Sequence, residues 1–156
     1  MVDYSTDHLN ERMPTKKQET EVSICTMLNR HVPEVIYISE LTSEDPLTEP
    51  DLKRLCRDRP VAVSVAELNE IIVGFMIYEI DERKLTITHL AVLPQRQRQG
   101  IAKRLVSKLT TPTKLAKRRV EALIIDSNLQ GHLFLSHIGF RAIEVIGEYY
   151  LFRFGG

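Results

Sequence analysis

Residues 90–102 have the sequence LAVLPQRQRQGIA, which predicts a buried strand, a tight loop and the first turn of a helix. Pro94 ends the strand, and Gly100 opens a helix in which apolar residues recur at helical spacing as far as Leu109. The N-terminus of a helix leaves backbone N–H groups unpaired and carries a partial positive charge, so it binds phosphate oxygens. Gly100 permits a ligand to approach closely, and Ala102 keeps the first turn uncrowded. The stretch therefore predicts a site for a small molecule rich in phosphate.

The charge distribution supports a site at the same place. Lys and Arg total 21 and Asp and Glu total 21, so the global charge indicates no nucleic-acid, membrane or acidic partner. Residues 1–94 hold 17 acids and 10 bases, whereas residues 95–119 hold nine bases and no acid. A solvated helix face is an alternative explanation of such a basic segment. Nucleic-acid binding by this segment is the weakest interpretation, because no aromatic residues are interleaved with its bases. The nine bases are Arg96, Arg98, Lys103, Arg104, Lys108, Lys114, Lys117, Arg118 and Arg119.

The rest of the chain fits a single mixed α and β domain built on one sheet. The length of 156 residues and the hydrophobic fraction of 43% are ordinary for one globular domain. We expect residues 1–20 to be a flexible leader and residues 21–156 to form the domain. Strands are predicted at residues 22–28, 61–67, 71–80, 85–92, 119–125, 141–146 and 148–154, and helices around Pro33, from Thr48 to Arg59, from Gly100, and at 129–138.

Several finer expectations can be checked against a structure. The first helix is expected to place Val32, Val35, Ile36 and Leu41 on one face. Thr48 is expected to cap the second helix. The two cysteines, Cys25 and Cys56, are expected to be buried thiols. No zinc spacing, signal peptide or membrane span is present in the sequence, so we expect no metal, no membrane contact and a cytoplasmic location.

Two motifs in order along the chain resemble those of a known superfamily. The string QRQGIA at residues 97–102 matches the Q/R-x-x-G-x-G/A signature of the GNAT superfamily of N-acetyltransferases, and LAVLP at residues 90–94 is similar to the strand before it. The string NLQGHLFLSHIGF at residues 128–140 resembles the later motif N-x-x-A-x-x-(F/L)-Y-x-x-x-G-F. Asp45-Pro46-Leu47-Thr48 and the pair Tyr149-Tyr150 are most similar to the ribosomal-protein-alanine N-acetyltransferase group. The resemblance implies a mostly antiparallel central sheet flanked by helices, and acetyl-CoA as co-substrate.

The resemblance also implies a set of site residues. Leu90, Ala91 and Val92 would pair with the pantetheine arm as a neighbouring strand would. Arg98, Gln99, Gly100, Ile101, Ala102 and Lys103 would cradle the pyrophosphate. Asn128 would contact the cofactor near its reactive end, although a helix N-cap explains it equally well. Phe134 could pack on the pantetheine but fits the core better. Tyr149 and Tyr150 would line the acceptor groove, and strand alternation lets only one of them touch the substrate.

The catalytic pair of the resembled group is missing here. Its general base, a glutamate, and its general acid, a tyrosine, correspond to Leu123 and Leu135, and neither leucine can move a proton. His89, just before Leu90, is a replacement base that would act through water, although a hydrogen-bonded sheet histidine is the alternative. Tyr149 is the surviving acid.

Three further titratable residues lie near these positions. Glu79 could hold a water molecule or face solvent, and His132 and His137 are expected at the surface.

These observations predict an acetyl-CoA-dependent N-acetyltransferase acting on a protein or peptide N-terminal α-amine. An α-amine needs less help from a base than lysine does, because a larger fraction of it is already neutral near pH 7. The acidic balance of residues 1–94 would favour a basic acceptor. The alternatives are a small-molecule amine acetyltransferase, and a catalytically degenerate CoA-binding partner or sensor.

Overall fold

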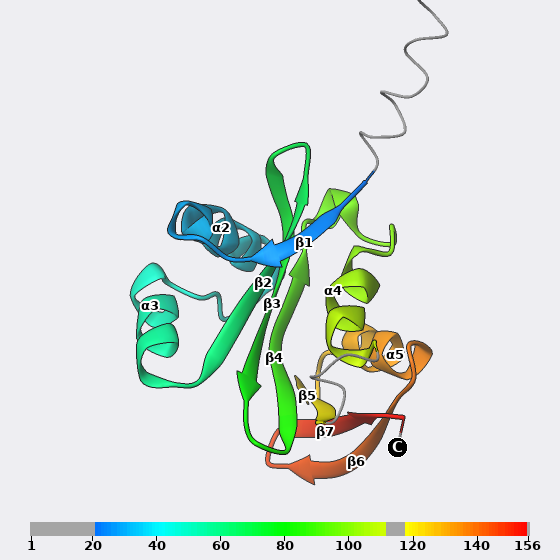
Figure 1. The fold of residues 1–156 in the computed structure, drawn as a ribbon. Coiled ribbons are helices and arrows are strands. Elements are labelled where there is room, and N and C mark those ends of the chain that lie inside the picture. Colours follow the sequence, from blue (N-terminus) through cyan, green and yellow to red (C-terminus); the bar gives the residue numbers. More distant parts are fainter. Residues whose placement is uncertain (1–20, 112–117, 156) are drawn as a thin grey trace, which may run out of the picture.

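A computed structural model describes residues 21–111 and 118–155 (Figure 1). The expected leader, residues 1–20, lies outside the described residues. Within them, seven strands form one sheet in the order β1-β2-β3-β4-β5-β7-β6. Every neighbouring pair is antiparallel except β4 and β5, which are parallel. The elements are β1 (Ser23–Thr26), α2 (Val32–Thr42), α3 (Glu49–Asp58), β2 (Val61–Leu68), β3 (Ile71–Ile80), β4 (Lys84–Val92), α4 (Ile101–Thr110), β5 (Arg119–Ile125), α5 (Leu129–His137), β6 (Phe140–Ile146) and β7 (Tyr149–Phe154), with 3-10 turns η1 (Asn29–His31) and η2 (Pro94–Arg96).

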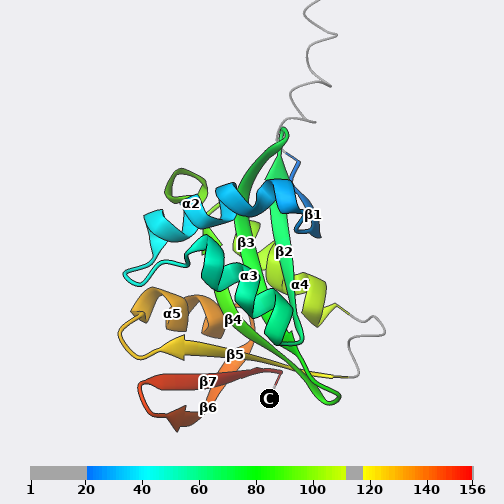
Figure 2. The ribbon, with the colours of Figure 1, turned by 90° about the vertical axis from the view of Figure 1, so that its left-hand side faces the viewer.

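Helices cover both faces of the sheet. Figure 1 shows α2 and α3 on one side and α4 and α5 on the other, and Figure 2 looks onto α2 and α3. The apolar core runs through the sheet, with fully buried side chains such as Val35 on α2, Phe75 on β3 and Leu105 on α4. The predicted mixed fold with a mostly antiparallel sheet is confirmed. No helix among residues 21–111 and 118–155 is long and apolar enough to cross a membrane.

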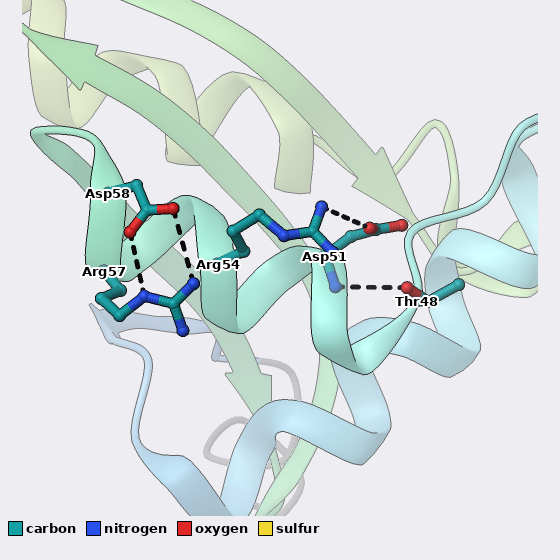
Figure 3. A network of polar contacts seen from close by, with 5 residues as sticks. All are labelled: Thr48, Asp51, Arg54, Arg57 and Asp58. Carbon is teal, nitrogen blue, oxygen red and sulfur yellow. Dashed lines mark hydrogen bonds and ion pairs between the residues drawn. The ribbon is translucent and has the colours of Figure 1, made fainter.

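Local signals in the sequence account for where two elements start and turn. Thr48 caps α3, because its Oγ1 accepts a hydrogen bond from the backbone N–H of Asp51 at 3.2 Å. Figure 3 shows this cap beside two exposed ion pairs, between Arg54 and Asp51 and between Arg57 and Asp58. The β2–β3 hairpin turns through Asn69 and Glu70, whose φ angles of 52° and 66° match the twist of the flanking strands.

Two finer expectations are wrong. The buried stripe of α2 runs through Val32, Val35, Ile38 and Ser39, whereas Leu41 is 45% exposed. The stripe from Val35 advances by three and four residues, and at 100° per residue Leu41 falls outside it. Ser39 belongs to the stripe because its Oγ accepts a hydrogen bond from the N–H of Leu47 at 2.8 Å. The two thiols are not both buried either, since Cys25 is half-buried and Cys56 is exposed.

Candidate active site

The parallel pair β4 and β5 separates part of the way along its length. The strands are in register from Lys84 with Arg119 to Ile87 with Ala122, and the pairing stops there. Beyond this point β4 continues beside β3 only, and Figure 2 shows β5 turning away from it. We call this place the fork, which comprises residues 88–92 of β4 and residues 123–125 of β5. It leaves one edge of β4 without a partner strand.

Backbone groups of two β4 residues point into the fork. The N–H of Leu93 donates to the carbonyl oxygen of Val73 at 2.8 Å, which sets the alternation along the strand. The backbone groups of Ala91 therefore point toward β3, and those of Leu90 and Val92 point away from it. The carbonyl oxygen of Val92 accepts a hydrogen bond from Nε2 of Gln97 at 3.1 Å. Leu90 and the N–H of Val92 thus face the fork as an unpaired strand edge would, which suits the amides of an extended ligand.

The loop between β4 and α4 is shaped for an anion. Arg98 has a φ of 64° and Gly100 a φ of 82°, and alternation of left-handed with ordinary residues turns successive N–H groups toward one point. Helix α4 begins at Gly100 without a side-chain cap. A side chain added at Gly100 would meet no atom within 4 Å, so the space above the helix end is open. Positive charge, open N–H groups and open space fit a pyrophosphate.

The predicted pyrophosphate residues divide into two groups. Arg98, Gln99, Gly100 and Lys103 are exposed around the loop, whereas Ile101 is only 2% exposed. A Cβ at Gly74 of β3 would lie 3.5 Å from Cγ2 of Ile101, so this side chain packs α4 against the sheet. Ala102 is half-buried beside it. Ile101 and Ala102 therefore hold the end of the helix in place, and the polar residues present it to a ligand.

His89 and Leu123 lie on the α2 and α3 side of the sheet. Gly74 faces α4, so Ile77, which stands three residues further along β3, faces the other way, as does its cross-strand partner His89. On β5, Ile124 contacts Gly131 of α5, so Leu123 faces away from α5. His89 is half-buried, and its Nδ1 lies 3.0 Å from Oγ1 of Thr88. Burial lowers the pKa of His89 below its ordinary value of 6.5, which keeps the ring neutral near pH 7.

The two tyrosines face opposite sides of the sheet. Tyr150 pairs with Ile124, and its ring lies edge-on to that of His132 on α5 with centroids 4.9 Å apart. Tyr149 pairs with Ile125, is 46% exposed and faces the same side as His89 and Leu123. His132 is half-buried, with its Nε2 3.2 Å from the carbonyl oxygen of Ile125, and His137 is exposed, as expected. The ring of His132 packs edge-on against the rings of Tyr150 and Phe152 on β7.

Residues of the later motif mainly build α5. Oδ1 of Asn128 accepts a hydrogen bond from the N–H of Gly131 at 2.9 Å, so Asn128 is the N-cap of this helix. Phe134 is half-buried against the core. Leu135 is 4% exposed and Leu123 is half-buried, so the two positions of the missing acid–base pair are filled with packed apolar side chains.

Charged side chains on the α2 and α3 side are engaged with one another. Glu79 is expected from the sequence to hold a water molecule or to face solvent; its Oε1 lies 2.6 Å from Nη2 of Arg59, so it pairs with a cation. Glu121 is 1% exposed, and its Oε2 lies 2.8 Å from Nη2 of Arg153. Glu121 was not among the predicted site residues, although it is a single acid inside the apolar strand RVEALII. Glu121 also faces Lys84, at 3.7 Å, and so joins β5 to β4 and β7.

A hollow of about 460 Å³ at the β2–β3 turn is lined by none of the predicted site residues. Its walls are Arg30, His31, Glu34, Glu67 and Glu70. Glu34 accepts a hydrogen bond from the N–H of Ile72, and Nδ1 of His31 accepts one from the N–H of Leu28. These side chains secure the hairpin and the start of α2.

In the part of the chain that the structure describes, no group of three His, Cys, Asp or Glu side chains could hold a metal ion.

Comparison with protein families decides what this arrangement belongs to. The family model described as an acetyltransferase (GNAT) domain matches residues 59–142, which include β4, the anion loop, α4, β5 and α5. This chain belongs to the GNAT family of acetyltransferases. The expected reaction class, acyl transfer from acetyl-CoA, is thereby confirmed at the level of the family. A comparison with curated protein sequences found no significant match.

Solved structures share the fold of this GNAT chain at low sequence identity. The PaiA N-acetyltransferase of Thermoplasma acidophilum in complex with coenzyme A has a TM-score of 0.73 and 14% identity, over 86% of this chain and 98% of that one. The ribosomal-protein-S18-alanine N-acetyltransferase of Escherichia coli also has a TM-score of 0.73, with 17% identity over 86% and 93% of the two chains. Naa50 of Arabidopsis thaliana, in complex with the bisubstrate analogue CoA-Ac-MVNAL, has a TM-score of 0.68 and 12% identity over 86% and 99%.

Proposed function

We propose that this protein transfers the acetyl group of acetyl-CoA to the N-terminal α-amine of a peptide or protein. The observation that carries the proposal is the fork, which has an anion loop at one end and, on the α2 and α3 side, a half-buried histidine but no carboxylate at position 123. Two structural neighbours support a peptide or protein acceptor. One is named a ribosomal-protein-S18-alanine N-acetyltransferase, and the other is in complex with the bisubstrate analogue CoA-Ac-MVNAL. A cytoplasmic location stays a prediction from the sequence.

The proposed place of acetyl-CoA follows the unpaired backbone. Its pyrophosphate would lie on the N-terminus of α4, held by the N–H groups there and by Arg98, Gln99 and Lys103. Its pantetheine amides would pair with Leu90 and with the N–H of Val92, as an added strand does. The thioester would then lie in the fork beside Asn128. Acetyl-CoA supplies an activated acyl group, and the chain has to orient it and to manage protons.

His89 is proposed as the proton acceptor and Tyr149 as the proton donor. The acceptor arrives as an ammonium ion and loses one proton to the imidazole of His89, directly or through water. The amine nitrogen then attacks the thioester carbonyl, a C–N bond forms, and the C–S bond breaks. Tyr149 gives a proton to the departing sulfur and regains one from the amide nitrogen. The products are the N-acetyl amide, the free thiol of CoA and one proton released to water.

The missing carboxylate favours an α-amine over a lysine. An α-amine has a pKa of about 7.7–8.0, so roughly a tenth of it is neutral at pH 7, whereas lysine, at about 10.4, is neutral to less than about 0.1%. A neutral, half-buried histidine can remove the proton of an α-ammonium group but gives little help with that of a lysine ammonium group. The absence of a carboxylate at Leu123 therefore matters less for an N-terminal acceptor.

Cofactor binding is the first measurement. Thermal unfolding with acetyl-CoA at about 100 times its Kd should show roughly 2.7 kcal/mol of added stability. Replacement of Gly100 by valine should abolish the shift. Gly155→Val is the matched control, since Gly155 also has a left-handed φ, of 68°, and is outside the anion loop. If acetyl-CoA stabilises Gly100→Val as much as the wild type, the anion loop is not part of the binding site.

Turnover is the second measurement, with release of the CoA thiol as the readout. A peptide with a free α-amine should be acetylated, and the same peptide with a blocked N-terminus and one lysine should not. A small amine such as a polyamine, accepted in place of the peptide, would favour the small-molecule alternative. Binding of acetyl-CoA without turnover of any amine would favour a degenerate CoA-binding partner or sensor, which the packed Leu123 and Leu135 also permit.

A further inference from the structure

We propose that Thr88 is a positioning residue that holds the ring of His89 in the tautomer protonated on Nδ1, so that Nε2 is the nitrogen that receives the proton of the amine. The inference rests on the proposed function of His89. It adds a residue that none of the motifs contains and that touches neither substrate nor cofactor.

Thr88 is the extra residue of a bulge in β4. The register pairs Tyr78 with Ile87 and Ile77 with His89, so Thr88 has no partner of its own on β3. A bulge inserts one residue into a strand and turns the residues beside it. This bulge stands directly after the last β4–β5 pair, at Ile87 and Ala122. It therefore shapes the strand at the place where the fork begins and aims the side chain of His89.

Hydrogen bonds at the bulge favour the tautomer of His89 that carries its proton on Nδ1. Oγ1 of Thr88 lies 3.4 Å from the carbonyl oxygen of Ile77 and 3.0 Å from Nδ1 of His89. A hydroxyl has one proton, and a carbonyl oxygen can only accept. When Thr88 donates to Ile77, it must accept from His89, so Nδ1 carries the hydrogen. In the neutral ring the lone pair then lies on Nε2.

Nε2 of His89 is the nitrogen open to the outside. Among the described residues it has no hydrogen-bond partner, and none of their buried side-chain nitrogen atoms lacks one, so Nε2 is reached by solvent. A half-buried ring with one satisfied and one open nitrogen suits a base that acts through water. The arrangement resembles the oriented base of other acyl-transfer sites, in which a second group fixes the tautomer.

The carboxylates on this side of the sheet pair with other groups or are exposed, so Thr88 is the group that orients the ring. Glu79 on β3 pairs with Arg59, and Glu121 on β5 pairs with Arg153 and Lys84. On α2, Glu34 accepts a hydrogen bond from the N–H of Ile72, whereas Tyr37 and Glu40 are exposed.

On α3, Asp51 pairs with Arg54 and Asp58 pairs with Arg57, and Cys56 is exposed. On the far face, α4 carries Lys103, Arg104 and Lys108, and on β7 Tyr149 is exposed.

Nitrogen NMR of the histidine rings tests the proposal without any assumption about catalysis. In the wild-type chain above the pKa of His89, its ring should show the hydrogen on Nδ1. Thr88→Val keeps the shape but removes the hydroxyl, and the hydrogen should then redistribute between the two nitrogens. Thr88→Ser keeps the hydroxyl and should restore the wild-type pattern. A wild-type ring with its hydrogen on Nε2 would overturn the proposal, and this reading needs no variant to fold.

Kinetics tests the consequence for the reaction. Thr88→Val should lower kcat by about tenfold, the loss of one hydrogen bond of roughly 1.4 kcal/mol, and should move the acid limb of the pH profile. KM for acetyl-CoA should not change, and Thr88→Ser should recover most of kcat. An unchanged pH profile in Thr88→Val would contradict the positioning role. If His89→Gln leaves kcat intact, the proposed base is wrong, and the NMR result still reports on Thr88 separately.

Discussion

Removal of either member of the buried pair Glu121 and Arg153 should destabilise the fold, and by unequal amounts. The carboxylate side chain is 2% exposed, and its Oε2 accepts a hydrogen bond from Nε of Arg153 at 2.9 Å and lies 2.8 Å from Nη2 of the same guanidinium. The guanidinium side chain is 32% exposed and can turn toward water. Glu121→Gln therefore leaves a guanidinium that can be solvated by water. Arg153→Met leaves a buried carboxylate for which Lys84, at 3.7 Å, is the one remaining ion-pair partner among the described residues.

The magnitudes follow from this asymmetry. A buried charge without its partner costs about 3–5 kcal/mol, which is the expected loss for Arg153→Met. Loss of a hydrogen bond to a charged group costs about 1.5–3 kcal/mol, and relaxation of Arg153 toward water places Glu121→Gln near the lower figure. The double variant should be about 2 kcal/mol more stable than the sum of the single changes predicts, because the two side chains contact each other.

Urea unfolding of the wild type, the two single variants and the double variant at pH 7 measures these differences. Arg57→Met is the matched control, because its ion pair with Asp58 is exposed, at 68% and 52%, and should contribute less than about 1 kcal/mol. Additive effects of the two changes, or a greater loss in Glu121→Gln than in Arg153→Met, would refute the reasoning.

Three further changes have defined outcomes. Burial lowers the pKa of His89 below 6.5, so the unfolded chain binds more protons than the folded one as the pH falls below about 6.5. The free energy of unfolding should therefore decrease as the pH falls. His89→Phe should reduce this pH dependence, as measured by urea titrations at about pH 7 and 5. A methyl group added at Gly131 would lie 2.0 Å from Cδ1 of Ile124 and 2.8 Å from Nδ2 of Asn128, both at the ends of side chains that can move, so Gly131→Ala should lower the free energy of unfolding by about 1 kcal/mol. Ile124→Val in the same chain should recover part of this loss, and no recovery would exclude the clash with Ile124 as the cause. Thr48→Ala removes the cap of α3 and should cost about 1 kcal/mol in thermal unfolding, with Thr48→Ser close to the wild type.

Local signals in the sequence were sufficient for the elements and for the loop that begins α4. Thr48 and Asn128 cap the helices that they were expected to cap, since a cap depends on residues two or three positions away. Gly100 has the left-handed backbone that a glycine before a helix indicates. The motif order along the chain then agrees with the family that the comparison shows.

Only the tertiary structure decided which side chains are brought together around the fork. Alternation separates Tyr149 from Tyr150, but the order of β5, β7 and α5 determines that Tyr150 meets His132 and that Tyr149 is exposed. The sequence does not reveal the bulge at Thr88 or the pairing of Glu121 with Arg153, because both depend on register between strands far apart in the chain. Helix caps and turns are short-range, whereas the burial of a charge or the tautomer of a ring is set by neighbours that arrive only when the sheet has formed.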